Sequence, residues 1–219
     1  MVSEFVHTSP YREAIPTRIA LTPLDYVGKR MFDLVFALIV TVLILSWLIP
    51  VLGLVICLTS RGPAIYMQRR TGLNGRPFWC LKFRTMIYQP GQPFQQAQRG
   101  DRRVTRLGSY LRRTNLDEMP QFLNVLMGNM SIVGPRPHAV QHDAQYWKTT
   151  NYSDRYLIRP GITGLAQVRG CRGETSDLIK MQHRVRLDLY YIRKTSFGLD
   201  IRICWLTLKQ MVRGNLNAW

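Results

Sequence analysis

The longest apolar stretch of the chain runs from Leu34 to Leu58 and contains no charged side chain. As a helix, its 25 residues are long enough to cross a bilayer core of about 30 Å. Lys29 and Arg30 precede the stretch and Arg61 follows it, and basic flanks favour the cytoplasmic side of a membrane. The pattern therefore predicts either one ordinary spanning helix or a helix that enters the membrane, breaks and returns to the same face.

A polar and helix-breaking group lies in the middle of this stretch, at Ser46, Trp47 and Pro50. Proline removes a backbone donor and kinks a helix. We expect the membrane break at Ser46 and Pro50.

The remaining pattern predicts a short β element followed mainly by helices. We expect strands at Ala64–Gln68 and Pro77–Phe83, around a Gly72–Gly75 turn. Helical periodicity predicts three further segments, which are Val104–Met127, Leu178–Tyr191 and Phe197–Val212. The last could lie in a membrane interface or pack on the core. The fold class predicted is mainly α with a small β element (α+β).

The charge of the chain indicates an anionic partner. Its formal net charge is +17, and arginines outnumber lysines 24 to 6. Arginine presents a planar fork of donors that suits phosphates. Nucleic acid, phospholipid head groups and a phosphorylated substrate all fit this excess. The four scattered cysteines form no CxxC pair and indicate no metal site.

The candidate chemical centre is the acidic pair Asp117-Glu118, which follows several arginines and precedes Pro120. Proline is common in the first turn of a helix, so the pair should lie near a helix N-terminus. One carboxylate there can act as a nucleophile while the other holds Mg²⁺. The pair could equally be a solvated cap that balances the arginines. His138 and His142 are four residues apart, and we interpret them as surface histidines rather than zinc ligands.

Several motifs together resemble those of the bacterial sugar transferase family, the monotopic phosphoglycosyl transferases. The matching segments are Lys29–Leu34, Ser60–Pro63, Gln68–Gly72, Lys82–Met86, Leu111–Gln121, Ser131–Pro137, Arg159–Gly164 and Leu187–Tyr191. They occur in the family's order between about Lys29 and Leu208.

The resemblance implies an enzyme that transfers a sugar 1-phosphate from a UDP-sugar to undecaprenyl phosphate and releases UMP. It assigns the nucleophile to Asp117, Mg²⁺ binding to Glu118, and phosphate binding to Arg112 and Arg136, with Lys82 nearby. It implies a covalent phosphosugar-aspartate intermediate in the first membrane step of exopolysaccharide, capsule, O-antigen or glycan synthesis.

The same resemblance favours the re-entrant form of the membrane helix. It predicts a polar segment at 1–28, a re-entrant membrane helix at 29–61 and a cytoplasmic catalytic domain with interfacial amphipathic helices at 62–219. The expected location is the bacterial inner membrane, with the catalytic domain facing the cytoplasm and phospholipids as partners.

Three features depart from the family pattern. The family breaks its membrane helix at Ser-Pro, whereas Trp47 follows Ser46 here; Leu165 replaces a common tryptophan; and the four-helix membrane region of longer members is absent. We therefore expect the short form, which contains the catalytic unit alone.

The rival interpretation is a non-catalytic basic membrane protein that binds anionic lipids. Nucleic acid is disfavoured because the basic residues alternate with rigid Gly-Pro turns and an acidic pair, without a recognised nucleic-acid fold. The transferred sugar, the polysaccharide pathway and a homo-oligomeric state are left open by the sequence.

Overall fold

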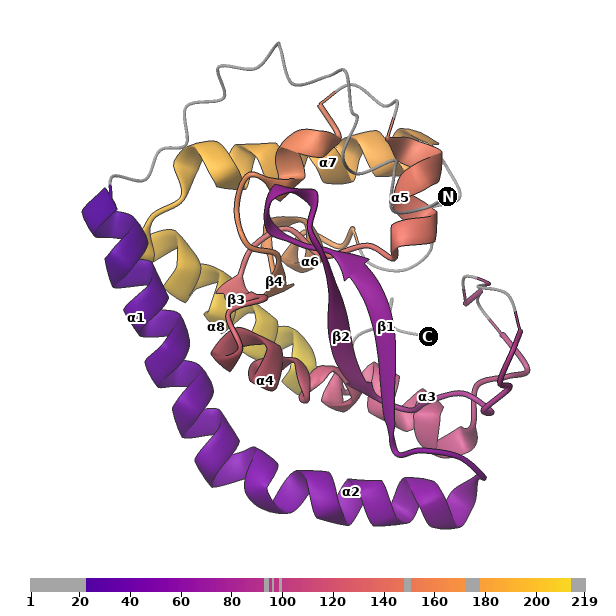
Figure 1. Cartoon of the computed structure of the whole chain (residues 1–219). Coiled ribbons are helices and arrows are strands. Elements are labelled where there is room, and N and C mark those ends of the chain that lie inside the picture. The colour runs from indigo at the N-terminus through magenta and orange to yellow at the C-terminus, as the bar shows by residue number, and fades with distance from the viewer. Residues whose placement is uncertain are drawn as a thin grey trace.

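The computed structural model describes residues 23–92, 95, 97–98, 100–147, 151–171 and 178–213. The chain is mostly helical with two small two-stranded sheets (Figure 1), which confirms the α+β prediction. Most of the polar segment predicted at 1–28 lies outside the described residues, and its last part, 23–28, begins the first helix.

The apolar stretch forms a long bent helix along one side of the molecule (Figure 1). It consists of α1 (Pro23–Val40), a π-helical turn (Thr41–Leu45) and α2 (Ser46–Thr59). From Tyr26 to Thr59 it is long and apolar enough to cross a membrane, with a mean hydropathy of 2.8 in its most apolar window and 22% of that window buried.

The bend has a local cause in the sequence. Pro50 cannot donate to the carbonyl of Ser46, and its ring crowds that carbonyl. The preceding turn widens, and the Ser46 N–H bonds to the Thr41 carbonyl, five residues back as in a π-helix. Side chains bond to the next two carbonyls: Ser46 Oγ donates to Val42 O at 2.7 Å and Trp47 Nε1 to Leu43 O at 3.0 Å. The distortion therefore precedes Pro50, which lies inside α2.

Polar bonds fix α1 to the rest of the chain, and we call this group the helix junction (Lys29, Asp33, Ile132, Tyr191 and Asp200). Lys29 Nζ donates to Asp200 Oδ2 at 2.6 Å, and the Tyr191 hydroxyl donates to Asp200 Oδ1 at 2.7 Å. Asp33 Oδ1 accepts the Ile132 N–H at 3.0 Å. Both carboxylates are buried.

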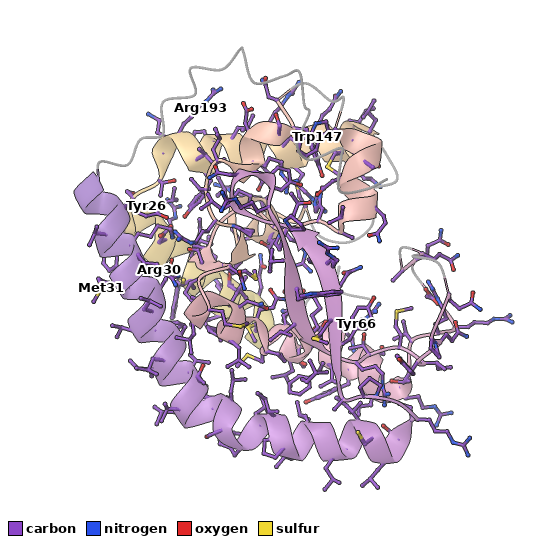
Figure 2. The ribbon with its side chains drawn as sticks, viewed as in Figure 1. Tyr26, Arg30, Met31, Tyr66, Trp147 and Arg193 are labelled. Carbon is purple, nitrogen blue, oxygen red and sulfur yellow. The ribbon has the colours of Figure 1, made fainter. Side chains whose placement is uncertain are left out.

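Neighbouring residues of α1 point in opposite directions. Arg30 is directed toward the domain and Met31 away from it (Figure 2). Arg30 donates to the Val125 carbonyl at 2.9 Å. One side of α1 is thus bound to the domain while the other is exposed.

Two strands form an antiparallel hairpin, as predicted. β1 (Ile65–Thr71) is longer than expected, and β2 (Pro77–Phe83) has the predicted bounds. The register pairs Tyr66 with Lys82 and Arg70 with Phe78. Cross-strand partners project from the same face, so Lys82 shares a face with Tyr66.

The single helix predicted at Val104–Met127 is wrong in detail. The structure divides it into α3 (Arg106–Arg113), a 3₁₀ turn (Leu116–Glu118) and α4 (Gln121–Leu126). Asn115 has a left-handed backbone with φ 56°, a conformation that asparagine tolerates better than most residues. This reversal places the acidic pair on a tight turn between two helices.

Two parallel strands, which the sequence analysis did not predict, support the turn formed by Pro135, Arg136 and Pro137. β3 (Ser131–Val133) pairs with β4 (Gly161–Thr163). A Cβ at Gly161 would lie 2.1 Å from Gly134 N, so this close backbone approach requires glycine. Between β3 and β4 the chain forms α5 (Val140–Tyr146) and a 3₁₀ turn (Ser153–Tyr156), and after β4 it forms α6 (Leu165–Val168).

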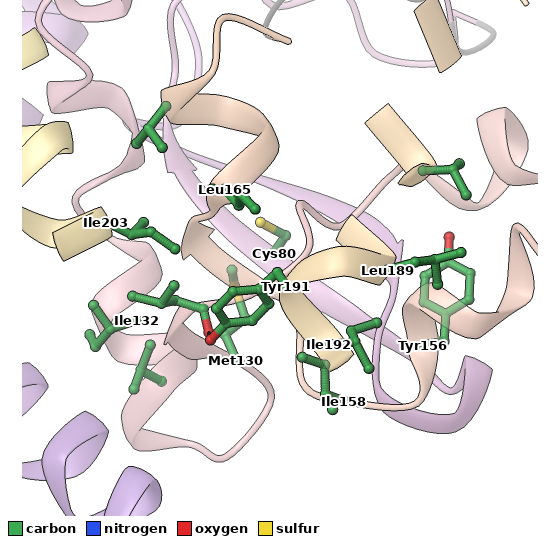
Figure 3. Packing of buried hydrophobic residues seen from close by; sticks show 14 of the residues in the cluster. Cys80, Met130, Ile132, Tyr156, Ile158, Leu165, Leu189, Tyr191, Ile192 and Ile203 are labelled. Atoms are coloured by element: carbon green, nitrogen blue, oxygen red, sulfur yellow. Dashed lines mark hydrogen bonds between the residues drawn. The ribbon is translucent and has the colours of Figure 1, made fainter. Parts of the chain in front are cut away.

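Two long helices complete the fold, α7 (Leu178–Lys194) and α8 (Phe197–Arg213), close to their predicted bounds. Their inner faces join the main core, in which Tyr191, Ile192 and Ile203 pack near Met130 and Ile132 (Figure 3).

The outer face of α8 is also apolar. It exposes a stripe at spacings of four, four and three residues, formed by Phe197, Ile201, Trp205 and Leu208. Of the two predicted alternatives, a helix in a membrane interface and a helix on the core, the structure shows packing on the core. The opposite face of α8 is apolar and exposed.

Candidate active site

Four of the predicted site residues come together from three parts of the chain. Lys82 lies near the end of β2, Asp117 and Glu118 lie on the 3₁₀ turn, and Arg136 lies on the turn after β3. Charge–charge contacts link all four. The sequence separations mean that the fold, rather than local structure, assembles this cluster.

Glu118 is the bonded member of the acidic pair. Lys82 Nζ donates to its Oε1 at 2.7 Å, and Arg136 Nη1 donates to its Oε2 at 3.0 Å. Arg136 Nη2 also bonds to Oε1, so the arginine grips the carboxylate with two parallel bonds. Burial by itself would raise the pKa of Glu118, but Arg136 and Lys82 outweigh it and hold the pKa well below its usual range.

Asp117 is the under-bonded member. Within the described residues it accepts no hydrogen bond, and Lys82 Nζ stands 4.0 Å from its Oδ2. Burial raises the pKa of Asp117 to about 6, against the opposing charge of Lys82 and with help from the negative charge of Glu118. Two adjacent carboxylates thus have different protonation behaviour because their partners differ, which is typical of catalytic acid pairs.

The basic side chains around the acidic pair are largely buried. Burial lowers the pKa of Lys82, although Glu118 opposes the shift. The fifth predicted residue, Arg112 on α3, donates through Nε to Thr85 Oγ1 at 2.9 Å, and its guanidinium interacts electrostatically with Asp117. A phosphate that approached Asp117 would meet fixed positive charges on several sides.

The predicted Mg²⁺ can be tested against the donor set. Among the described residues no group of three or more His, Cys, Asp or Glu could hold a metal. Mg²⁺ commonly uses one or two protein carboxylates and completes its shell with substrate phosphates and water. Glu118 Oε2 accepts one bond from the described residues and an oxygen can accept a second. The acidic pair therefore fits a metal shared with a phosphorylated substrate.

The interpretation of His138 and His142 as surface histidines is wrong. Both are buried, at 6% and 7% exposure. His138 Nδ1 lies 2.6 Å from the Tyr152 hydroxyl, which donates to Asp143 at 2.5 Å. His138 precedes α5, which carries His142, and it belongs to a polar network behind the site.

That network also contains Arg155 and Asp188, which the sequence analysis did not single out for the site. Arg155 Nε donates to Asp188 Oδ2 at 2.7 Å. The sequence motifs could have drawn attention to both residues. Asp188 lies inside the motif Leu187–Tyr191, and Arg155 lies shortly before the motif Arg159–Gly164. A buried role for an arginine cannot be read from its type alone, because most arginines are exposed.

Comparison with known proteins agrees with the motif resemblance. The sequence model of the family described as bacterial sugar transferase matches residues 24–214. The chain is 48% identical over 192 residues to the UDP-glucose:undecaprenyl-phosphate glucose-1-phosphate transferase of Escherichia coli (strain K12), an alignment that covers 85% of this chain and 41% of that protein.

Two shorter relatives are covered more fully. A protein of Caulobacter vibrioides with the same description is 47% identical over 84% of this chain and 69% of its own length. The exopolysaccharide production protein PSS of Rhizobium leguminosarum bv. phaseoli is 41% identical over 87% of this chain and 98% of its own length. With the match covering most of the chain, the protein belongs to the bacterial sugar transferase family.

Proposed function

We propose that this chain transfers a sugar 1-phosphate from a UDP-sugar to undecaprenyl phosphate, giving undecaprenyl-diphosphate-sugar and UMP. The observation that carries the proposal is the division of the acidic pair, with Glu118 bonded to two cations and Asp117 left without a hydrogen bond among the described residues. A carboxylate near cations and free of hydrogen bonds is suited to attack phosphorus. The names of the relatives from Escherichia coli and Caulobacter vibrioides state the same class of transfer.

The proposed chemistry has two balanced steps. An Asp117 carboxylate oxygen attacks the phosphorus that carries the sugar, the bond to the bridging oxygen breaks, and UMP leaves with the electron pair. In the second step an oxygen of the lipid phosphate attacks the same phosphorus. The bond to Asp117 breaks and the free carboxylate returns. Neither step requires Asp117 to lose a proton above its pKa of about 6.

The chain's cations would orient the substrate and stabilise charge in both steps. Arg136 and Lys82 both bond to Glu118, so their charges are directed at the acidic pair. Preorganised charge of this kind stabilises a phosphoryl transition state without reorganisation. Arg112 would contact a phosphate from the side of α3.

Glu118, with Asp117 beside it, would hold Mg²⁺ together with the diphosphate. A bound Mg²⁺ would supply neutralisation of charge on the phosphates and the leaving UMP. Chelation should then abolish turnover and added Mg²⁺ should restore it. Full activity in excess chelator would exclude this role.

We propose further that the bent α1–α2 helix is re-entrant in the bacterial inner membrane, with the domain after Arg61 in the cytoplasm. Support comes from the bend (Figure 1) and from exposed apolar side chains along both arms, such as Leu38, Leu54 and Leu58. The apolar outer face of α8 would lie in the interface. Lys29 and Arg30 contribute less to this argument than their charge suggested, because both bond within the protein.

Cysteine labelling tests the topology. After all four native cysteines are replaced by serine, we place single cysteines at Gly28 and Arg61, which are both exposed, and label intact cells with a membrane-impermeant maleimide. The re-entrant form predicts labelling of both positions only after the inner membrane is opened. Labelling of one position from the periplasm would favour a spanning helix.

Turnover tests the function itself. Purified protein with Mg²⁺ and undecaprenyl phosphate should release UMP from one member of a panel of UDP-sugars. UDP-glucose is the first donor to test, because two of the relatives described above carry it in their names. Salt-sensitive binding to anionic vesicles without UMP release from any donor would instead support the non-catalytic alternative.

A further inference from the structure

The turn that carries Arg136 is held by an unusual number of backbone bonds. Four consecutive carbonyl oxygens accept a donor: Pro135 O from Gly161 N at 2.9 Å, Arg136 O from Arg155 Nη2 at 2.9 Å, Pro137 O from Arg70 Nη1 at 2.8 Å, and His138 O from Thr71 N at 3.1 Å. Pro135 and Pro137 also restrict the backbone. The turn is therefore fixed from three separate segments of the chain.

Of the two side chains that donate to this turn, Arg155 is buried, with 1% of its surface exposed, whereas Arg70 is partly exposed. Its Nε donates to Asp188 Oδ2 at 2.7 Å, and its Nη1 lies 3.1 Å from His138 Nδ1. Two of the guanidinium nitrogens, Nε and Nη2, thus donate to defined acceptors, and the group lies over the Tyr152 ring at 5.1 Å. A planar guanidinium held at two points and against a ring can move little.

We propose that Arg155 is a positioning residue, which fixes the backbone of Arg136 and so directs the Arg136 guanidinium onto Glu118. This inference rests on the function proposed above, because its main test measures the rate of that reaction. Arg155 itself is too buried to meet a substrate, and its effect passes through the Arg136 carbonyl. A misplacement of about 1 Å in such a group can cost about a hundredfold in rate.

The neighbouring histidine favours this arrangement. Arg155 Nη1 and Arg184 Nη1 face the two ring nitrogens of His138, at 3.1 and 3.2 Å. Burial and these two cations hold the pKa of His138 well below its ordinary value. A neutral ring can stand beside the Arg155 guanidinium, whereas a protonated one would repel it.

The competing explanation is that Arg155 and Asp188 form a buried ion pair that serves stability alone. Arg155→Lys distinguishes the two, because lysine keeps the charge opposite Asp188 but cannot also reach Arg136 O. We expect Arg155→Lys to lower kcat about 10- to 100-fold with a smaller change in KM. A role in stability alone would lower the unfolding midpoint and leave kcat per folded molecule unchanged.

A double-mutant cycle with Arg136→Lys tests the route of the effect. If Arg155 acts through Arg136, adding Arg155→Lys to the Arg136→Lys protein should change kcat less than about twofold, because the group it positions is already lost. Independent losses that multiply in the double variant would overturn the proposal, as would a kcat per folded molecule of Arg155→Lys equal to that of the parent.

Arg84→Lys is a matched control, because Arg84 is also buried and donates to the carbonyls of Ser60 and Arg61. It should lower the unfolding midpoint like Arg155→Lys without lowering kcat per folded molecule. Asp188→Glu is a second variant if Arg155→Lys does not fold, since it keeps both charges and pushes the guanidinium toward the turn. It should lower kcat more than it changes KM, and wild-type kinetics would count against the proposal.

Failure of the proposed function can be told apart from failure of this inference. If the parent protein releases no UMP from any UDP-sugar, the function is wrong, and the cycle is then measured on unfolding midpoints. Coupling through the turn predicts that Arg155→Lys and Arg136→Lys together lower the midpoint by less than the sum of their separate effects. Strict additivity there would overturn the positioning role.

Discussion

At the helix junction Lys29 bonds to Asp200, and at the candidate active site Lys82 bonds to Glu118, so each region pairs a lysine with a largely buried carboxylate. The regions differ in their second carboxylate. Asp33 accepts the Ile132 N–H at the junction, whereas Asp117 accepts no hydrogen bond from the described residues. A saturated network holds a structure together, and an unsaturated one keeps a group available to react.

This difference predicts that substitutions at the helix junction mainly change the stability of the fold, whereas substitutions of Asp117 mainly change activity. Loss of a carboxylate at the junction leaves a lysine without its partner and should weaken folding. Loss of Asp117 removes a charge whose burial raises its pKa, so it should cost folding little. Functional residues that are less than optimal for stability are a general feature of enzymes.

The largest effect should follow Asp117→Asn. An amide cannot form the proposed bond to phosphorus, so we expect UMP release to fall at least about 1,000-fold. UDP-sugar alone, without lipid, should leave phosphosugar mass on the parent peptide that contains Asp117 and none on the variant. The unfolding midpoint should stay the same or rise. A ternary-complex rate pattern with no trapped adduct would instead favour direct attack by the lipid phosphate.

Asp200→Asn should give the opposite result. The amide cannot neutralise Lys29, whose side chain is 14% exposed, and we expect a loss of about 3 kcal/mol in the free energy of unfolding. Turnover per folded molecule should remain within a few-fold of the parent. Urea unfolding in detergent measures the loss, and adding Lys29→Met should recover part of it. An unchanged midpoint would show that the junction is not a stabilising contact.

Arg136→Lys should have a smaller effect on activity than Asp117→Asn. Lysine keeps the charge but cannot bond to both Glu118 oxygens as Arg136 does, so we expect kcat/KM to fall about 10- to 100-fold. Steady-state rates across UDP-sugar concentrations measure this. Parent-like kinetics would mean that positive charge alone is required.

Sequence patterns predicted the parts of this protein that depend on local order. The β1–β2 hairpin, α7 and α8 follow from periodicity and turn residues, and motif resemblance named Lys82, Asp117, Glu118 and Arg136, which the fold brings together. Each of these signals lies within one short segment.

Features that depend on distant contacts were missed. The pairing of β3 with β4 involves strands of three residues each, too short for a periodic signal. The left-handed Asn115 divides a segment whose apolar pattern is continuous. His138 and Arg155 are polar residues that pattern assigns to the surface, and they are buried because their side chains meet polar partners, Tyr152 for His138 and Asp188 for Arg155.

The smallest predicted effect concerns the pH dependence of Asp117. If the ionised carboxylate attacks phosphorus, the rate should rise with pH through about 6. The negative charge of Glu118 is one cause of the raised pKa of Asp117, so Glu118→Gln should move this acid limb to lower pH. Lys82 and Arg136, released from Glu118, would act in the same direction.

Adduct formation from UDP-sugar without lipid is the step to measure. A lipid monophosphate has its own ionisation near pH 6, which would hide the Asp117 titration in full turnover, whereas this half-reaction omits the lipid. At saturating Mg²⁺ we expect the acid limb of Glu118→Gln to lie up to about one pH unit below the parent, a differential interaction of about 1.4 kcal/mol or less. An upward shift would mean that Glu118 holds the cations where they lower the pKa of Asp117 most, and the active site would then depend on a bonded carboxylate just as the helix junction does.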